Sequence, residues 1–281
     1  MIPSPACGGG QGGGRTIMQF RKWVRLLAAF AAALSTAAPA AAQDSLAKIK
    51  ERGKLVAGVK FDTPPFGYLD DNNEPVGFDL DLVREVGKRL GVPVEFVKVT
   101  SPTRIPLLVS GNVDLIAASM THTRERDKVI DFSITYYTGA QSLLVAKASG
   151  IGGLKDLAGR TVAVQQGTTL EKNIAAVAPG ARIIGFRDYD SAWLALVQGR
   201  ADALTGSLDI LRGFARDNPN FVILPDRFSL EPFGIGVRQG DAALRDEINF
   251  TLQDLWTSGR YAELYRKWFG AEPEFPIEVW P

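Results

Sequence analysis

Short β-rich runs alternate with turn-and-helix segments along most of this chain, and that alternation constrains the fold more than any other feature. Residues 54–60 (KLVAGVK) and 94–99 (VEFVKV) are runs of strand-forming residues. Between them, residues 78–91 carry apolar side chains at helical spacing and end at a glycine, which is typical of a helix and its stop. Strands that alternate with helices predict an α/β fold with mainly parallel sheets.

The same order of elements occurs twice along the chain. Strand, turn and helix, strand, helix and strand follow one another in residues 54–119, and a similar series starts at residue 141. The chain is also longer than most single domains, so we expect two α/β lobes. Polar loops follow four of the predicted strands. Because ligands bind beyond the carboxyl ends of strands in such sheets, these loops predict one cleft between the lobes.

The N-terminus has the pattern of an export signal. After a low-complexity glycine run, three basic residues follow Met18, then a short apolar run, then small residues that end at Ala42. This order predicts that residues 1–42 are an N-terminal extension and signal peptide, cleaved after Ala42, and that the protein is periplasmic. An uncleaved N-terminal anchor is the alternative. Cleavage would leave 28 basic and 31 acidic residues, a net charge of −3.

The residues that the chain lacks exclude several kinds of chemistry. Its one cysteine, Cys7, lies upstream of the apolar run, so cleavage leaves no disulfide, no thiol nucleophile and no cysteine-bound metal. Its one histidine, His122, cannot build a His-rich zinc site, and no G-x-S-x-G elbow accompanies it. A mildly acidic surface argues against nucleic acid as a partner. We expect no metal and no cofactor.

Several longer stretches resemble one protein family, and they occur in the family's order from about residue 44 to the end. They are GVKFDTPPFGYLD, GFDLDLVREVGKRLGV, TSPTRIPLLVSGNVDLIAASMTHTRERDKVIDFS, LAGRTVAVQQGTTLE and SGRYAELYRKWFG. The chain resembles the periplasmic polar amino acid-binding proteins of ABC importers, solute-binding protein family 3. The resemblance implies a type II periplasmic binding protein fold, in which two α/β lobes on a two-strand hinge close on one amino acid. It implies a monomer, not an enzyme, that delivers its ligand to an ABC importer permease in the inner membrane.

The resemblance also implies a division of the chain. In the family the chain crosses between the lobes twice, and here those crossings match positions near 144–147 and 234–237. Lobe 1 is then expected at residues 44–144 plus 236–281, and lobe 2 at residues 147–233.

A Ser-x-Thr-x-x-x-x-Arg pattern holds the ligand's α-carboxylate in the family. Ser119, Thr121 and Arg126 match that pattern residue by residue. The chemistry agrees, because a carboxylate suits a planar guanidinium in bidentate geometry together with short hydroxyl donors. The alternative for Arg126 is a solvent-facing ion pair with Glu125 or Asp127.

Other positions of the family's pocket are matched in both predicted lobes. In the second lobe these are Gln165, Thr168 and Thr169, and the two threonines lie at a strand-to-helix turn that suits an anion. In the first lobe, Phe66 is expected to form an apolar wall of the pocket. The alternative is that the PPF sequence is only a rigid turn with a core phenylalanine.

Two basic residues bear on the identity of the ligand. Lys60 and Arg104 match positions that carry basic residues in the members of the family that bind acidic amino acids. They predict glutamate or aspartate, with glutamine or asparagine as neutral relatives. A basic ligand is disfavoured, because two cations near its side chain would be costly once desolvated. The alternative for Arg104 is a structural salt bridge.

One position departs from the family's pattern. An aspartate that pairs with the ligand's α-ammonium is replaced by Ser207, and Asp209 lies two residues later. Either Asp209 receives the amine, or Tyr189 and backbone carbonyls do, or the ligand is an amine-free dicarboxylate. The similarity also extends to periplasmic dehydratases of prephenate-like or arogenate-like substrates, although the pocket loops contain no obvious catalytic Glu or His. A separate subunit that delivers ligand to a membrane receptor is a third alternative.

Overall fold

A computed structural model describes residues 45–280, together with Met1 and Gly8. The predicted signal peptide and the cleavage site after Ala42 lie outside the described residues. Within the described part of the chain, no helix combines the length and the apolar composition that a membrane crossing requires.

The first lobe is built on a five-stranded sheet, whose strands in spatial order are β5 (Val94–Lys98), β1 (Leu55–Val59), β6 (Leu115–Ala117), β15 (Gly236–Arg238) and β7 (Ile130–Phe132). β5, β1 and β6 are parallel, whereas β15 comes from the C-terminal part of the chain and is antiparallel to both β6 and β7. β1 is apolar and buried along its whole length, as the interior strand of a parallel sheet requires.

Helices cover this first sheet, and they are α2 (Ser45–Arg52), α3 (Phe78–Leu90), α4 (Arg104–Val109), α8 (Ala242–Thr257) and α9 (Arg260–Phe269). The predicted stop of α3 is confirmed: Gly91 adopts φ 71°, a left-handed conformation that glycine accepts without strain. The two C-terminal helices, α8 and α9, pack against α3. A small sheet of β2 (Asp62–Thr63), β3 (Gly67–Leu69) and β4 (Pro75–Val76) forms the turn-rich connection after β1.

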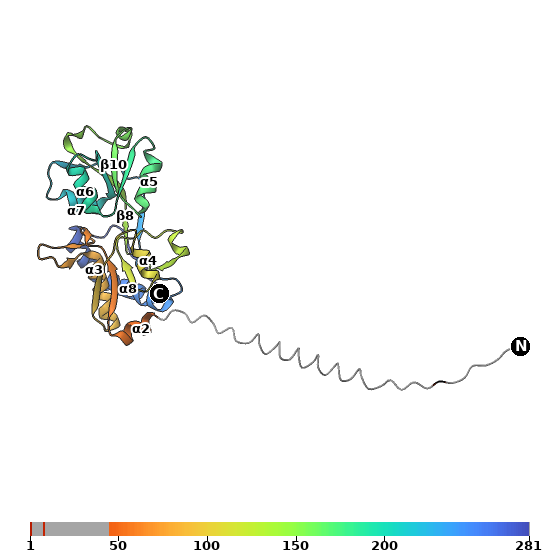
Figure 1. Ribbon diagram of the computed structural model, residues 1–281. Helices are drawn as coiled ribbons and strands as arrows, with labels where there is room; N and C mark the ends of the chain where they lie inside the picture. The colour runs from red at the N-terminus through yellow and green to blue at the C-terminus, as the bar shows by residue number, and fades with distance from the viewer. Residues whose placement is uncertain (2–7, 9–44, 281) are drawn as a thin grey trace. The chain divides into compact units, whose positions relative to one another are not determined.

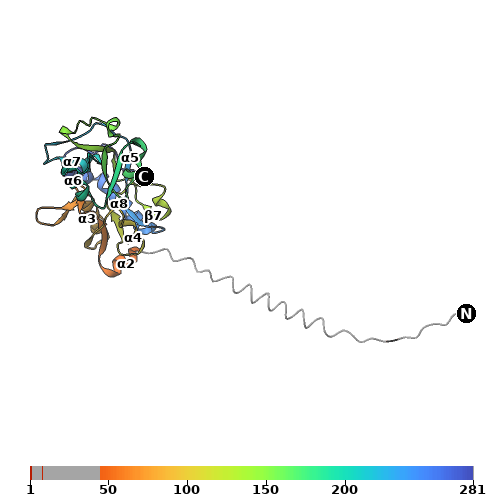
Figure 2. The same cartoon turned by 45° about the horizontal axis from the view of Figure 1, so that its top comes forward.

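The second lobe has its own five-stranded sheet, with the strands β11 (Arg182–Phe186), β10 (Thr161–Gln165), β12 (Ala203–Ser207), β9 (Gln141–Ala146) and β13 (Phe221–Ile223) in spatial order. Its helices are α5 (Thr169–Val177), α6 (Tyr189–Val197) and α7 (Leu208–Ala215). Figures 1 and 2 show α5, α6 and α7 around this second sheet, with α2, α3, α4 and α8 around the first. The mixed α/β architecture in two lobes is therefore confirmed.

The chain passes between the two sheets at other points than those predicted. β8 (Tyr137–Gly139) and β14 (Glu231–Phe233) pair with each other in antiparallel register and belong to neither large sheet (Figure 1). The crossing predicted near 144–147 is wrong, because β9 is already paired with β12 and β13 in the second sheet. The crossing predicted near 234–237 is too late, because Gly236 already lies between β6 and β7.

Candidate functional site

A narrow cleft lies between the two sheets, with about 320 Å³ of empty space that includes open solvent. Loops after β1, β6, β10 and β12 contribute to it, which are the four strand ends that the sequence singled out. The residues that line it are Lys60, Thr63, Ser101, Arg104, Ala118, Ser119, Thr121, Gln165, Thr168, Thr169, Leu170, Tyr189, Ser207, Ile210 and Phe233.

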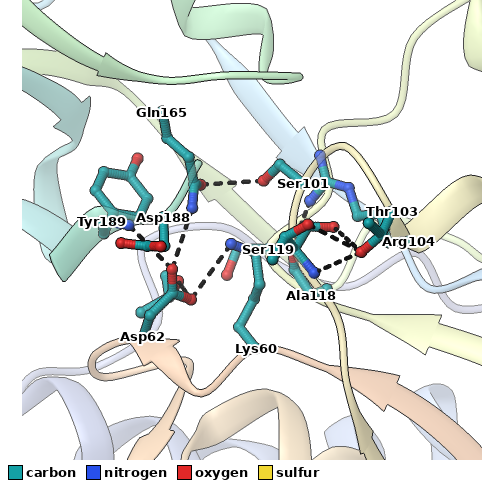
Figure 3. Close-up of polar contacts among 12 residues, drawn as sticks. Lys60, Asp62, Ser101, Thr103, Arg104, Ala118, Ser119, Gln165, Asp188 and Tyr189 are labelled. Atoms are coloured by element: carbon teal, nitrogen blue, oxygen red, sulfur yellow. Dashed lines mark hydrogen bonds and ion pairs between the residues drawn. The ribbon is translucent and has the colours of Figure 1, made fainter. Parts of the chain in front are cut away.

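Lys60 is a buried cation with a carboxylate neighbour that the sequence analysis missed. Only 2% of Lys60 is exposed, and its Nζ lies 3.4 Å from Oδ1 of Asp62. Burial lowers the pKa of Lys60 to about 8, although Asp62 opposes that shift. Asp62 also accepts hydrogen bonds from Nε2 of Gln165 (3.2 Å) and from the backbone N–H of Tyr189 (3.0 Å). Figure 3 shows the three residues converging on Asp62, which thus joins the two lobes.

Arg104 is a buried cation that forms no direct ion pair with any described residue, although the charge of Asp79 acts on it from farther away. Its side chain is 2% exposed, Nη1 donates to the carbonyl oxygen of Ala118 at 2.7 Å, and Nε has no hydrogen-bond partner (Figure 3). Among residues 45–280, no acidic group lies within ion-pair distance of it, so the structural salt bridge considered above is not observed. Burial, assisted by the nearby charge of Arg126, lowers the pKa of Arg104 to about 9, which leaves it cationic at neutral pH.

Ser119 is held at the cavity by a buried aspartate. Its backbone N–H donates to Oδ2 of Asp79 at 2.8 Å, and the hydroxyl of Tyr136 donates to Oδ1 at 2.8 Å. Ser119 has φ 47°, an uncommon conformation for a residue other than glycine, and these contacts fix it. Burial raises the pKa of Asp79 to about 7, since desolvation outweighs its hydrogen bonds.

Thr121 and Thr169 bring the two lobes together at a second buried carboxylate. Their Oγ1 atoms lie 3.3 Å apart, and each lies 2.6 Å from Oε2 of Glu231. Glu231 belongs to the crossing strand β14 and is 2% exposed. Its contact with the two threonines could not be predicted from the sequence, because no local pattern indicates which hydroxyl groups a residue of a crossing strand will reach.

Arg126 lies beside the cavity and does not line it. Its Nη1 donates to the carbonyl of Thr121 at 2.6 Å, and its Nη2 donates to the carbonyl of Gly167 at 3.2 Å, in the other lobe. Burial lowers its pKa. The solvent-facing ion pair considered above is not observed, since Glu125 pairs with Lys172 and Asp127 pairs with His122. Arg126 therefore clamps backbone from both lobes in this structure.

The second lobe presents neutral polar groups to the cavity. Oε1 of Gln165 accepts a hydrogen bond from Ser101 at 3.0 Å, and the hydroxyl of Thr168 donates to the carbonyl of Gln165 at 2.6 Å. The hydroxyl of Tyr189 is buried, lines the cavity and has no partner. Ser207 lines the cavity at the end of β12.

Two expected positions differ in the structure. Phe66 does not line the cavity: it is fully buried, with ring centroids 4.8 Å from Tyr137, 5.3 Å from Phe269 and 5.5 Å from Phe233. It is thus a core residue, and Phe233 forms the aromatic wall instead. Asp209 is not at the cavity either, because it accepts hydrogen bonds from the hydroxyl of Tyr137 and from Arg212.

Two lobes on a pair of crossing strands, with a polar cavity between them, define a two-lobed solute-binding protein. The profile of the bacterial extracellular solute-binding proteins, family 3, matches residues 55–271. The chain belongs to that family.

Curated relatives carry related names. The chain is 41% identical over 236 residues to the ABC transporter glutamine-binding protein GlnH of Bacillus subtilis, covering 82% of this chain and 86% of that one. It is 34% identical over 240 residues to the L-glutamate/L-aspartate-binding protein of Pseudomonas aeruginosa, covering 80% of each chain.

Solved structures agree in fold. A mutant of ArgBP from T. maritima superposes with a TM-score of 0.78 at 39% identity, covering 81% of this chain and all of that one. The ancestral amino acid-binding protein AncCDT-1, described as a precursor of cyclohexadienyl dehydratase, gives a TM-score of 0.76 at 38% identity, covering 80% of this chain and 99% of that one.

Proposed function

We propose that this protein captures an amino acid between its lobes outside the cytoplasm and delivers it to the permease of an ABC importer. The family, and relatives named as ABC transporter amino acid-binding proteins, support this role. The basic and apolar pattern before Ala42 supports export to the periplasm. The protein acts as a monomeric carrier and not as an enzyme.

The ligand that fits the site is an acidic amino acid, glutamate or aspartate, with glutamine as the neutral relative. The observation that carries this proposal is Arg104 at the wall of the cavity: its guanidinium is 2% exposed, and among residues 45–280 its Nε has no hydrogen-bond partner and no carboxylate lies within ion-pair distance of it. A buried charge is costly unless it is paired, so a ligand carboxylate is its natural partner. The charge of Lys60 is already offset by Asp62, so a ligand with a neutral amide side chain is also compatible with the site.

An arginine ligand fits less well, although arginine-bound ArgBP is among the similar structures. Its side chain would bring a second guanidinium into a cavity lined by Lys60 and Arg104. Like charges brought together in a desolvated site cost several kcal/mol, and Asp62, the carboxylate paired with Lys60, already accepts four hydrogen bonds.

Ligand binding favours the closed arrangement because the proposed contacts come from both lobes. Lys60, Arg104, Ser119 and Thr121 line the cavity from the first lobe, and Arg126 of the same lobe lies beside it. The second lobe supplies the remaining proposed contacts, which are Gln165, Thr168, Thr169, Tyr189 and Ser207. A ligand that touches both groups only after closure shifts the equilibrium toward the closed state. We propose that rotation occurs at β8 and β14, and that residues 140–230 move as the second lobe.

Calorimetry on the chain from Gln43 to Pro281 tests the ligand class. The protein is partially unfolded and dialysed to remove carried-over ligand, then titrated with glutamate, aspartate, glutamine, arginine, succinate, 2-oxoglutarate and prephenate. We expect binding of glutamate, aspartate or glutamine with a Kd of about 1 μM or tighter, near −8 kcal/mol. Arginine bound as tightly as glutamate would overturn the acidic-ligand proposal.

A dehydratase or a binder of amine-free dicarboxylates is the second candidate, and Ser207 favours it. Position 207, at the end of β12, lacks a carboxylate for an ammonium, and AncCDT-1 relates this fold to a dehydratase lineage. Lys60, with a pKa of about 8, is a group at the cavity wall suited to proton transfer near neutral pH. Release of product from prephenate, or tight binding of succinate or 2-oxoglutarate without glutamate, would select this candidate.

A further inference from the structure

An amino acid ligand brings a buried ammonium, and the usual place for its partner holds Ser207. Asp209 is turned to Tyr137 and Arg212. Asp62 is fully engaged as well: Oδ1 accepts from Lys60 and Thr63, and Oδ2 accepts from Gln165 and Tyr189. A buried ammonium with no anion nearby is costly, so another negative group must act on it.

Glu231 is a buried carboxylate whose partners are all neutral. Oε2 accepts from the hydroxyls of Thr121 and Thr169, each at 2.6 Å. Oε1 accepts from Nδ2 of Asn173 and Oγ of Ser229, each at 2.8 Å. Within the described residues 45–280, no Lys, Arg or His lies within 4.0 Å of its oxygens, and Arg126 acts on its charge only from farther away. Four hydrogen bonds, and no direct ion pair, therefore stabilise the carboxylate.

The two threonine hydroxyls transmit this negative charge to the cavity. A hydroxyl has one proton and two lone pairs, and a carboxylate only accepts. Both protons therefore point to Glu231, and the oxygens that line the cavity offer lone pairs alone. Since the two oxygens lie 3.3 Å apart, they form a twin acceptor polarised by the carboxylate behind them.

We propose that Glu231 is the positioning residue for the ligand's ammonium, acting through the hydroxyls of Thr121 and Thr169 in place of a carboxylate at position 207. This inference rests on the proposed amino acid ligand. It also links recognition to closure: Thr121 belongs to the first lobe, Thr169 to the second, and Glu231 to the crossing strand β14. The twin acceptor exists only while the lobes are together.

Glu231→Gln is the informative substitution, because it keeps the shape and reverses the polarity. The new amide N–H₂ donates to the hydroxyls that formerly donated to the carboxylate, so their protons turn toward the cavity. The matched control is Ser229→Ala, which removes one hydrogen bond to Glu231 and leaves the charge. Ser207→Asp in the Glu231→Gln background tests rescue by a carboxylate at the other position.

Calorimetry compares each variant on glutamate and glutamine and on their amine-free analogues, glutarate and glutaramate, with thermal melting as the check on folding. We expect Glu231→Gln to weaken binding of the amino acids about 30-fold and of the analogues less than about 3-fold, in keeping with a desolvated charge contact. Ser229→Ala should change neither by more than about 3-fold. Adding Ser207→Asp to the Glu231→Gln variant should raise its affinity for the amino acids at least about tenfold.

The outcomes separate this inference from the proposed function. If wild type binds amino acids and Glu231→Gln weakens both ligand classes equally, or neither, the inference is wrong and the proposed function stands. If wild type binds only the analogues, both are wrong. If the analogues bind too weakly to measure, the amino acid affinity of the double variant tests the inference. No recovery of that affinity on adding Ser207→Asp to Glu231→Gln would overturn it.

Discussion

The two walls of the cavity differ in charge. The wall from the first lobe carries the cations Lys60 and Arg104, whereas the wall from the second lobe carries only neutral groups such as Gln165, Tyr189 and Ser207. Neutral groups lose less than charges when water is removed. The first lobe can therefore select a ligand by charge while it is still open to water, and the second lobe can close over it at low desolvation cost.

The largest expected effect is on Arg104. Arg104→Met removes a buried cation that has no direct ion-pair partner among residues 45–280, and we expect glutamate affinity to fall by about 2–5 kcal/mol, since a buried charge contact is lost. The ligand-free variant should be at least as stable as wild type, because a buried unpaired charge has been removed. Calorimetry and thermal melting measure the two quantities. A ligand-free variant that melts far below wild type would assign Arg104 a structural role instead.

The next effect is a pH dependence from Lys60. Its pKa is about 8 in the ligand-free protein and 10.5 in the unfolded chain, so the folded state releases its proton first. Ligand-free stability therefore rises between pH 8 and 10.5. A ligand carboxylate raises the bound-state pKa, so binding takes up protons, and glutamate affinity falls as pH rises above about 8. Titrations at pH 8.5 in buffers of different ionisation enthalpy measure this uptake, which Lys60→Met should abolish.

A smaller effect is expected on the neutral wall. Tyr189→Phe removes a hydroxyl that has no hydrogen-bond partner among residues 45–280, so thermal stability should not fall. Ligand affinity should fall by about 0.5–1.5 kcal/mol, the value of one neutral hydrogen bond. Unchanged affinity for glutamate, aspartate and glutamine would show that this hydroxyl does not contact the ligand.

The smallest effect on binding is expected at Phe66, which the sequence placed at the cavity and the structure places in the core. Phe66→Leu should destabilise the protein by about 1–2 kcal/mol, through lost volume and lost ring contacts with Tyr137 and Phe269. Ligand affinity should stay within the error of calorimetry. Urea unfolding provides the free energy, and a large loss of affinity at full folding would contradict the core assignment.

The sequence predicted what depends on local pattern. Strand and helix alternation, the glycine stop of α3 and the polar loops at strand ends are all encoded within short windows, and they place Lys60, Arg104 and Ser119 at the cavity. The roles of Asp62 and Glu231 were not predicted, because the partners that link them to the other lobe, such as Gln165 for Asp62 and Thr121 for Glu231, lie more than 100 residues away in the chain. The crossings were misplaced because the same apolar run, Gln141–Ala146, suits a connecting strand and a sheet strand equally.

The order of the strands has a consequence for how the chain matures. Residues 140–230 form one uninterrupted insertion. The second lobe therefore contains all the strands of its large sheet as soon as β13 has been synthesised. The first sheet must wait for β15, which fits between β6 and β7 more than 100 residues after they are made. Until then both strands keep an unpaired edge, a template for aggregation. A nascent or C-terminally truncated chain is therefore most exposed to mispairing in its first lobe, the half synthesised first and completed last.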